Sequence, residues 1–165
     1  MFRRSIHSLN FKYTRGLVNQ FRYFNGIDES IYVADNKSKW FLKDYFEGIE
    51  KIGIIGWGSQ APSQAQNLRD SLKSVNLDIP IQIGLRENSN STKKVKELNF
   101  KVDSVENTLS TSDFNILLTS DASQAENYQH FFSCLKPGST LGLSHGFLLG
   151  HLKNMLNYIE DRRID

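Results

Sequence analysis

The 165-residue sequence has little of what marks a disulfide-bonded, membrane-bound or nucleic-acid-binding protein. Its one cysteine, Cys134, excludes an internal disulfide and fits a reducing compartment. No apolar run approaches the roughly 18 residues that a membrane-spanning helix needs, so we expect no membrane association. The formal net charge is only +2, whereas a nucleic-acid binder usually carries a dominant basic face. The length fits one domain of ordinary size.

Acidic residues are absent from the first 27 positions, and the first carboxylate is Asp28. The basic residues of this segment are Arg3, Arg4, Lys12, Arg15 and Arg22. Apolar residues recur every three or four positions, at Phe2, Ile6, Leu9, Tyr13 and Leu17. An acid-poor helix with one apolar and one basic face is typical of a transit peptide. We predict a mitochondrial address, with a plastid address or an address-free basic extension as alternatives, and place the folded domain at residues 28–165.

From Lys51 onward, short apolar runs alternate with helical patterns. Strands are expected over residues 52–55, 77–85, 100–102, 114–119 and 139–143. Helices are expected over residues 62–75, 92–99, 105–112, 122–135 and 147–162. This alternation predicts an α/β fold, a Rossmann-type doubly wound parallel sheet in three αβα layers. Ligands of such sheets bind outside the carboxyl ends of the strands, so the four turns that follow the strands are the candidate site.

The first turn, Gly56-x-Gly58-x-x-Ala61, matches the dinucleotide-binding fingerprint, which accepts Gly or Ala at its third position. Gly56 would permit the tight turn, Gly58 the close approach of a pyrophosphate, and Ala61 the packing of helix on strand. The N–H groups at the start of the next helix would hold the diphosphate. Because the pattern follows a predicted strand and opens a predicted helix, we prefer this interpretation to an ordinary glycine-bearing bend.

The second turn carries Arg86 directly after a predicted strand, with the hydroxyl groups of Ser89 and Ser91 nearby. A ribose 2′-hydroxyl is usually met here by an acidic residue and a 2′-phosphate by an arginine. A guanidinium with small donors around it suits a dianionic phosphate, which favours NADP over NAD. Glu87 opposes this interpretation because its carboxylate would repel the phosphate or accept from a ribose hydroxyl. A solvated polar loop is the alternative.

The third and fourth turns are also polar. Ser120 and Asp121 could serve only as caps of the next helix, or could line the nicotinamide half of a cofactor together with Gln124, and both interpretations stay open. His145 follows the last predicted strand beside Gly146, where an imidazole could exchange protons near neutral pH. The other histidines, His7, His130 and His151, have no comparable setting.

Four segments in this order resemble the N-terminal domain of ketol-acid reductoisomerase, also called acetohydroxy-acid isomeroreductase, most closely in its plant form. They are "IGIIGWGSQAPSQAQNLRDSL", "IGLRENSNS", "LLTSDASQAENY" and "LKPGSTLGLSHGFLLGHL". The resemblance places the pyrophosphate on Gly56, Trp57, Gly58, Ser59 and Gln60. It places the 2′-phosphate on Arg86, Ser89 and Ser91. The family's Ser-Asp-x-x-Gln segment falls on Ser120, Asp121 and Gln124, and its catalytic histidine falls on His145.

The resemblance implies NADP(H) and Mg²⁺ as cofactors, a 2-hydroxy-keto acid as substrate and a role in isoleucine and valine biosynthesis. Ala61 and Glu87 depart from the family pattern, which has glycine and usually a basic residue there. The family's helical domain, which supplies the carboxylates for Mg²⁺, would be absent, so the sheet would be incomplete relative to the family. The terminal Glu160, Asp161 and Asp165 are interrupted by arginines, and we assign no metal ligand.

We therefore expect the NADP-binding domain of a reductoisomerase, inactive alone because the alkyl shift lacks a Lewis acid. It would need a full-length homologue or a missing C-terminal half as partner. The alternative is a catalytically inactive, stand-alone NADP(H)-binding or regulatory module.

Overall fold

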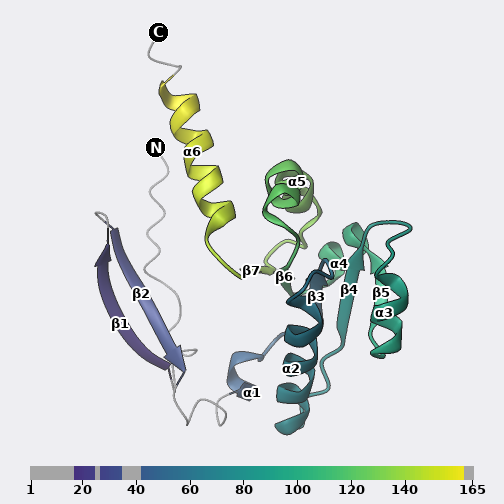
Figure 1. The fold of residues 1–165 in the computed structure, drawn as a ribbon. Helices are drawn as coiled ribbons and strands as arrows, with labels where there is room; N and C mark the ends of the chain where they lie inside the picture. The colour runs from purple at the N-terminus through teal and green to yellow at the C-terminus, as the bar shows by residue number, and fades with distance from the viewer. Residues whose placement is uncertain (1–16, 25–26, 35–41, 162–165) are drawn as a thin grey trace. The chain divides into compact units, whose positions relative to one another are not determined.

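The computed structural model describes the backbone of residues 17–24, 27–34 and 42–161 and the side chains of residues 42–155. The chain divides into two compact units, Met1–Gly48 with Leu72–Leu77 and Ile49–Ser71 with Asp78–Asp165. The second unit contains the candidate site and is a parallel α/β sheet (Figure 1).

The sheet has five parallel strands in the order β5-β4-β3-β6-β7. Their bounds are β3 Ile52–Ile55, β4 Ile81–Leu85, β5 Lys101–Ser104, β6 Phe114–Leu117 and β7 Thr140–Leu143. The central strand β3 pairs with β4 on one side and β6 on the other, and Ile54 is in register with both Ile83 and Ile116. Every residue of β3 and β4 is buried, as expected of strands covered on both faces.

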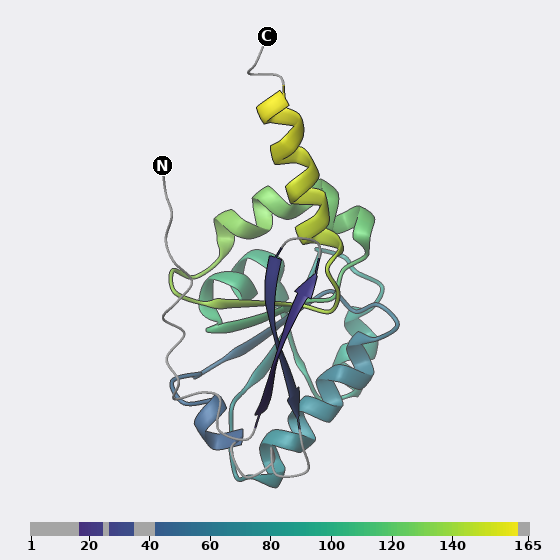
Figure 2. The same cartoon turned by 90° about the vertical axis from the view of Figure 1, so that its left-hand side faces the viewer.

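Helices connect the strands and cover the sheet. Their bounds are α2 Ala61–Ser74, α3 Thr92–Glu97, α4 Val105–Thr111, α5 Asp121–Cys134 and α6 Phe147–Asp161. Right-handed crossovers place α2 and α3 on one face and α4 and α5 on the other, and Figure 2 shows α2 on the opposite side of the sheet from α4 and α5. This is the predicted doubly wound fold in three layers, and the prediction of fold class is confirmed.

The predicted elements of the sheet unit are all present, with shifts at their ends. The strand predicted over residues 77–85 begins only at Ile81, because Pro80 has no N–H for the sheet and its carbonyl instead accepts from the Ile52 N–H at 3.0 Å. The weak strand predicted over residues 100–102 is displaced to Lys101–Ser104, since the Phe100 N–H donates to the Val95 carbonyl of α3 at 3.3 Å.

In the other unit, β1 Leu17–Phe24 and β2 Ile27–Ala34 form an antiparallel hairpin, followed by α1 Leu42–Tyr45. This hairpin was not predicted, and the boundary drawn after residue 27 falls inside β2. Of the apolar and basic residues named for the predicted targeting segment, Leu17 and Arg22 lie among the described residues, and both belong to β1. The transit peptide stays a prediction that falls largely outside the described residues.

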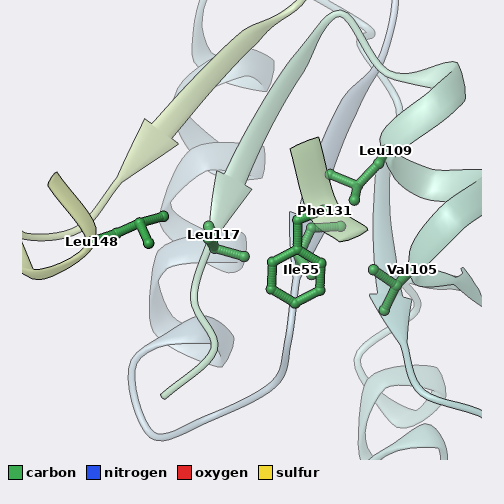
Figure 3. Packing of buried hydrophobic residues seen from close by; sticks show 6 residues of the cluster. All are labelled: Ile55, Val105, Leu109, Leu117, Phe131 and Leu148. Carbon is green, nitrogen blue, oxygen red and sulfur yellow. The ribbon is translucent and has the colours of Figure 1, made fainter. Parts of the chain in front are cut away.

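One part of the core lies between the sheet and helices α4 and α5. One cluster joins side chains from β3, β6 and helices α4, α5 and α6 (Figure 3): Ile55, Val105, Leu109, Leu117, Phe131 and Leu148. Each side chain of this kind contributes about 1.5–3 kcal/mol when it is fully buried. The cluster fixes the carboxyl ends of β3 and β6 against α4 and α5, and this is where the candidate site lies. None of the helices described is long and apolar enough to cross a membrane.

Candidate functional site

A cleft of about 770 Å³ lies at the carboxyl ends of β3, β4 and β6. The chain passes from β3 to β4 on one side and later returns to place β6 on the other side, so the strand order reverses beside β3. Such a reversal separates the loops at the strand ends and opens a crevice there. The cleft is lined by the turn after β3, the end of β4 with its loop, the turn after β6, the start of α4 and one face of α5.

Gly56 forms the bend at the floor of the cleft. Its φ of +94° is strained for any residue with a side chain, and an added Cβ would lie 2.9 Å from Thr119 Cγ2 and 3.1 Å from the Leu118 carbonyl oxygen. The Gly56 N–H donates to the Gly84 carbonyl at 3.0 Å, and the Leu118 N–H donates to the Ile55 carbonyl at 2.8 Å. Neighbouring strand ends therefore hold this turn, and only glycine fits it.

Gly58 also lines the cleft, but the fold does not require a glycine there. An added Cβ would find only the Leu118 carbonyl oxygen, at an ordinary contact distance of 3.7 Å. The space beside Gly58 opens toward the cleft rather than into packed protein. A ligand that approaches the backbone closely is the simplest reason for a glycine at this position.

Trp57 lies between these glycines and is half-buried at the cleft. Its ring makes an edge contact with Phe100, with 5.9 Å between the ring centroids. The Arg69 guanidinium lies 4.3 Å from the centre of the Phe100 ring and donates to the Leu98 carbonyl at 2.8 Å. This stack supports the Trp57 side of the cleft.

Ser59 and Gln60 are exposed and are not among the residues that line the cleft. They lie directly before α2, and the Gln60 carbonyl accepts from the Gln64 N–H at 3.0 Å in its first turn. The Gln60 side-chain oxygen also accepts from Gln64 Nε2 at 3.0 Å.

The second turn brings its three predicted phosphate ligands to the same cleft, which Arg86, Ser89 and Ser91 all line. The Ser89 N–H donates to the Arg86 carbonyl at 3.2 Å, and the Ser91 N–H donates to Ser89 Oγ at 3.3 Å. Asn88 adopts a φ of 58°, which bends the loop back. Glu87 is exposed and does not line this cleft. Its carboxylate would therefore repel a phosphate bound in the cleft less than its position beside Arg86 in the sequence indicates.

In the third turn, Ser120 acts as a helix cap and also lines the cleft. Its Oγ accepts from the Ser123 N–H at 3.4 Å at the start of α5. Gln124 is 2% exposed, and its Nε2 donates to the Thr119 carbonyl at 2.8 Å. Gln124 therefore fixes the turn and is not among the lining residues.

Asp121 and His145, from the third and fourth turns, pair with each other outside the cleft's lining. His145 Nε2 lies 3.2 Å from Asp121 Oδ1, and both side chains are about half exposed. His145 Nδ1 accepts from the Phe147 N–H at 3.3 Å, so Nε2 of the neutral ring carries the proton. The carboxylate and the Phe147 N–H thus select one tautomer and one orientation of the imidazole.

The cleft has a further wall that the turns alone do not indicate. It is formed by Glu106 at the start of α4 and by Ser123, Asn127 and His130 on α5. His130 Nε2 lies 2.8 Å from Glu106 Oε1, and this hydrogen bond lowers the pKa of the Glu106 carboxyl below its usual value. His130 follows no strand end, unlike His145, yet it lines this cleft. The spacing of residues 123, 127 and 130 places them on one helical face, and this periodicity is the signal that could have found them.

Comparison with known protein families decides the class. Residues 48–157 match the family described as "Acetohydroxy acid isomeroreductase, NADPH-binding domain". This chain belongs to that family. The match contains all four turns and the wall on α4 and α5. It confirms the resemblance to ketol-acid reductoisomerase, and the family description supports NADP(H) as the cofactor.

Two plant relatives of this reductoisomerase family are about half identical to the chain. The chloroplastic ketol-acid reductoisomerase of Pisum sativum is 52% identical over 119 residues, which cover 69% of this chain and 20% of the relative. That of Spinacia oleracea is 48% identical over 136 residues, which cover 79% of this chain and 23% of the relative. The chain thus spans about a fifth of the length of these relatives.

A solved structure supports the fold. An NADH-preferring ketol-acid reductoisomerase from an uncultured archaeon matches with a TM-score of 0.51 at 32% identity, over 61% of this chain and 30% of that one. Its preference for NADH belongs to that protein. The match supports the α/β fold of this chain.

The relatives correct the prediction of cellular address. We expect a mitochondrial protein from the acid-poor N-terminus, but the pea and spinach relatives are both chloroplastic. The mitochondrial prediction is therefore wrong, and the relatives point to the plastid. The two kinds of transit peptide share a basic, acid-poor composition, so composition alone could not separate them.

Proposed function

We propose that this chain is the NADPH-binding part of a ketol-acid reductoisomerase. The family reaction is a Mg²⁺-dependent alkyl migration in 2-acetolactate or 2-aceto-2-hydroxybutyrate, followed by reduction with NADPH, in branched-chain amino-acid biosynthesis. The observation that carries the proposal is a glycine turn that opens into the same cleft as an arginine and two serines. A diphosphate and a 2′-phosphate are the two anions of NADP(H) that this pairing suits.

The chain's own residues fit the cofactor. Gly58 leaves room beside its backbone, and the N–H groups from Ser59 to the first turn of α2 are suited to hold the diphosphate. Arg86, with the hydroxyl groups of Ser89 and Ser91, would hold the 2′-phosphate through charge-assisted hydrogen bonds. When bound, NADPH supplies the hydride for the reduction.

His145 and Asp121 are assigned to the catalytic end of the cofactor, beside Ser120 and Gln124. His145 holds a proton at Nε2, which the neutral ring can donate to a ligand. Asp121 is 3.2 Å from that atom and would stabilise the imidazolium if His145 gains a second proton. Gln124 supports this end indirectly, by holding the Thr119 carbonyl.

The Mg²⁺ chemistry of the family does not fit the residues described. Among residues 42–155, no group of three or more His, Cys, Asp or Glu side chains is arranged to hold a metal ion. We assign no step of the alkyl migration to this chain. The 2-hydroxy-keto acid substrate and the metal would be bound mainly by a partner segment, either a C-terminal half or a full-length homologue.

Cofactor binding is tested with the full chain by titrating NADPH and NADH against the fluorescence of Trp57, in a Trp40→Phe background that removes the other tryptophan. We expect saturable binding and a preference for NADPH. Arg86→Ala should weaken NADPH binding by roughly tenfold or more, because charge-assisted hydrogen bonds are lost, and should leave NADH binding unchanged. The matched control is Lys101→Ala, which removes a positive charge at the start of β5 outside the cleft. Equal weakening by both variants would contradict a specific phosphate site.

The family activity is tested in a chimera. Residues 48–157 replace the matching segment of the spinach enzyme, and NADPH oxidation is measured with 2-acetolactate and Mg²⁺. Turnover that disappears with His145→Asn would support an enzymatic role. Tight NADPH binding by a folded chimera without turnover would favour the inactive, stand-alone binding module instead.

A further inference from the structure

The loop after β4, which carries the residues assigned to the 2′-phosphate, depends for its position on the short helix α3 that follows it. The Ser89 N–H donates to the Arg86 carbonyl at 3.2 Å, and the Thr92 N–H donates to the Ser89 carbonyl at 3.1 Å. These hydrogen bonds stay within the loop and the start of α3, where Ser91 makes no side-chain cap. The place of the loop relative to the glycine turn, residues 56–60, is therefore set by whatever holds α3.

The far end of α3 is held by an arginine from another helix. The last carbonyls of a helix have no partner within it, and at the end of α3 the Leu98 carbonyl accepts from Arg69 Nη1 at 2.8 Å. A positive charge at this end also interacts favourably with the helix dipole. Arg69 belongs to α2, the helix that begins directly after the glycine turn. It thus fixes α3 to the helix that opens at the assigned diphosphate site.

Phe100 connects the same arginine to the glycine turn itself. The Arg69 guanidinium lies 4.3 Å from the centre of the Phe100 ring, within the range of a cation–π contact. The same ring makes an edge contact with Trp57 of the glycine turn, with 5.9 Å between the ring centroids. Phe100 is 6% exposed, and its N–H donates to the Val95 carbonyl of α3 at 3.3 Å. One buried ring therefore touches the glycine turn, α2 and the end of α3.

Of the parts that meet at Phe100, the glycine turn is the more firmly fixed. The Gly56 N–H donates to the Gly84 carbonyl at 3.0 Å, and Thr119 packs against the same bend. In contrast, α3 has six residues, of which only Val95 is buried, and a helix this short depends on tertiary contacts. Loss of the Arg69 contacts would therefore displace α3 and its loop, and would leave the turn in place.

Stability of the fold is a poor explanation for an arginine at position 69. Among the described residues Arg69 makes no ion pair, and its Nε is buried without a hydrogen-bond partner. A partly buried guanidinium without a counter-charge is incompletely compensated for its lost hydration. Its two contacts, with the Leu98 carbonyl and the Phe100 ring, both act on the end of α3.

We propose that Arg69 is a positioning residue for cofactor selectivity. It holds α3 so that the Arg86 guanidinium meets a 2′-phosphate while the diphosphate of the same molecule lies on the glycine turn. The proposal rests on the proposed function, because both anions are those of NADP(H). Arg69 does not line the cleft and acts only through α3. NADH has no 2′-phosphate, so its binding does not depend on this placement.

The test measures dissociation constants for NADPH and NADH on the full chain by titration calorimetry. Calorimetry is used because the fluorescence of Trp57 would itself respond to a change at Phe100. Arg69→Met keeps an apolar stem and removes the donor and the charge. It should weaken NADPH binding roughly fivefold, the scale of a residue that acts through its neighbours, and should change NADH binding by less than about twofold. Arg69→Lys, which keeps the charge and one donor, should restore part of the preference for NADPH.

The matched control is Lys94→Ala, which removes an exposed positive charge from α3 itself. It should leave the ratio of the two dissociation constants within about twofold of the parent, because exposed charges are screened by salt and solvent. Circular dichroism at the titration temperature verifies that each variant is folded. If Arg69→Met does not fold, Phe100→Leu breaks the same connection with a smaller apolar side chain, and it should lower the ratio in the same direction.

A double variant identifies the residue through which Arg69 acts. In the Arg86→Ala background, Arg69→Met should weaken NADPH binding by less than about twofold, because two residues that serve one contact are not additive. A purely structural role would instead weaken NADPH binding by the same factor in both backgrounds.

The outcomes separate this proposal from the one on which it rests. A parent chain that binds neither nucleotide, or binds both equally, contradicts the phosphate site, and the role of Arg69 fails with it. If the parent prefers NADPH but Arg69→Met weakens both nucleotides equally, or weakens neither, only the role of Arg69 is overturned. An effect of Arg69→Met that is the same with and without Arg86 overturns it as well.

Discussion

The amino ends of the parallel strands, called the amino edge of the sheet, and their carboxyl ends, called the carboxyl edge, use polar residues differently. At the amino edge, Asp113 accepts from the N–H groups of Glu50 and Lys51 at 2.9 and 3.1 Å, and from Lys136 Nζ at 2.5 Å. At the carboxyl edge, the Arg86 guanidinium has no hydrogen-bond partner among the described residues. Asp113 is therefore satisfied within the protein, whereas the Arg86 guanidinium is available to a ligand. Stability and binding are thus separated along the strands.

Glycines show the same contrast within the carboxyl edge itself. Gly56 is demanded by the fold, because its φ is positive and Thr119 occupies the space of a side chain. At Gly58, neither the backbone conformation nor a contact among the described residues requires a glycine. Substitutions at these positions and at Asp113 can therefore separate the two uses of the sheet, and the expected effects on the free energy of unfolding decrease in the order given below.

The largest effect is expected from Gly56→Ala. The new Cβ would lie 2.9 Å from Thr119 Cγ2, and the φ of +94° would strain the backbone. Strain and overpacking together should lower the free energy of unfolding by about 3 kcal/mol. Urea unfolding of the full chain, followed by circular dichroism, measures this change.

Gly138→Ala is the matched control for Gly56→Ala. Gly138 also has a positive φ, of 81°, but an added Cβ would meet nothing within 4 Å. Only backbone strain remains, so a loss of about 1 kcal/mol is expected. Equal losses in the two variants would show that the contact between the turns after β3 and β6 does not constrain Gly56.

The next effect in size is expected at the amino edge. Asp113→Ala removes the acceptor of two backbone N–H groups, those of Glu50 and Lys51, just before β3. Unpaired donors at a partly buried site should cost about 2 kcal/mol in the free energy of unfolding. Dissociation constants for NADPH should stay within about twofold of the parent, because sites without shared partners act independently. A large loss of affinity in a still-folded variant would contradict the separation of the two edges.

The free energy of unfolding should also depend on pH through the ionisation of Asp113. The Lys136 ammonium, with help from the N–H groups of Glu50 and Lys51, holds the pKa of Asp113 below its usual value of 3.8. As the pH falls, the unfolded chain therefore binds a proton at Asp113 before the folded chain does. The contribution of Asp113 to the free energy of unfolding is complete well above pH 3.8 and is lost as the pH falls through the lower pKa of the folded state.

Asp113→Asn isolates this contribution from those of the other carboxylates. The difference in free energy of unfolding between the parent chain and the variant should be constant above about pH 5 and should shrink below it. Urea unfolding at several values between about pH 3 and pH 6 measures the difference. A difference that grows toward low pH would show that the pKa of Asp113 is raised in the folded state.

The strand-and-helix alternation was sufficient to predict the sheet unit, because continuous apolar runs such as Ile52–Ile55 and turn residues such as Pro137 mark each element locally. The hairpin of the other unit was missed for a different reason. The dipeptide Asn25-Gly26, between two strand-like runs, is a strong signal for a two-residue connection. The acid-poor composition of the same region favoured a targeting segment, and composition outweighed the local signal.

The candidate site was predictable where it follows a strand and not where it depends on contacts between helices. Gly56 and Arg86 come directly after a strand and Ser120 follows β6 after two residues, so the topology alone places them at one edge. The pair of Glu106 and His130 joins residues 24 positions apart on two helices, and only the packing of α4 against α5 brings them together. The role of Gln124 was uncertain for a similar reason, since its inward hydrogen bond to Thr119 depends on a rotamer.

The smallest effect on stability, and the sharpest test of the contrast, is expected from Gly58→Ala. The nearest atom to the new Cβ would be the Leu118 carbonyl oxygen at 3.7 Å, and no positive φ opposes a side chain. The variant should be as stable as the parent or more stable by about 0.5 kcal/mol, because alanine restricts the unfolded chain. Its affinity for NADPH should nevertheless fall by at least about tenfold, since the methyl group occupies the space through which the backbone must approach a diphosphate. Urea unfolding and the Trp57 titration measure the two quantities on the same preparation. A variant that keeps both its stability and its affinity would remove the diphosphate from this turn, because no structural requirement would then be left to explain why position 58 is a glycine.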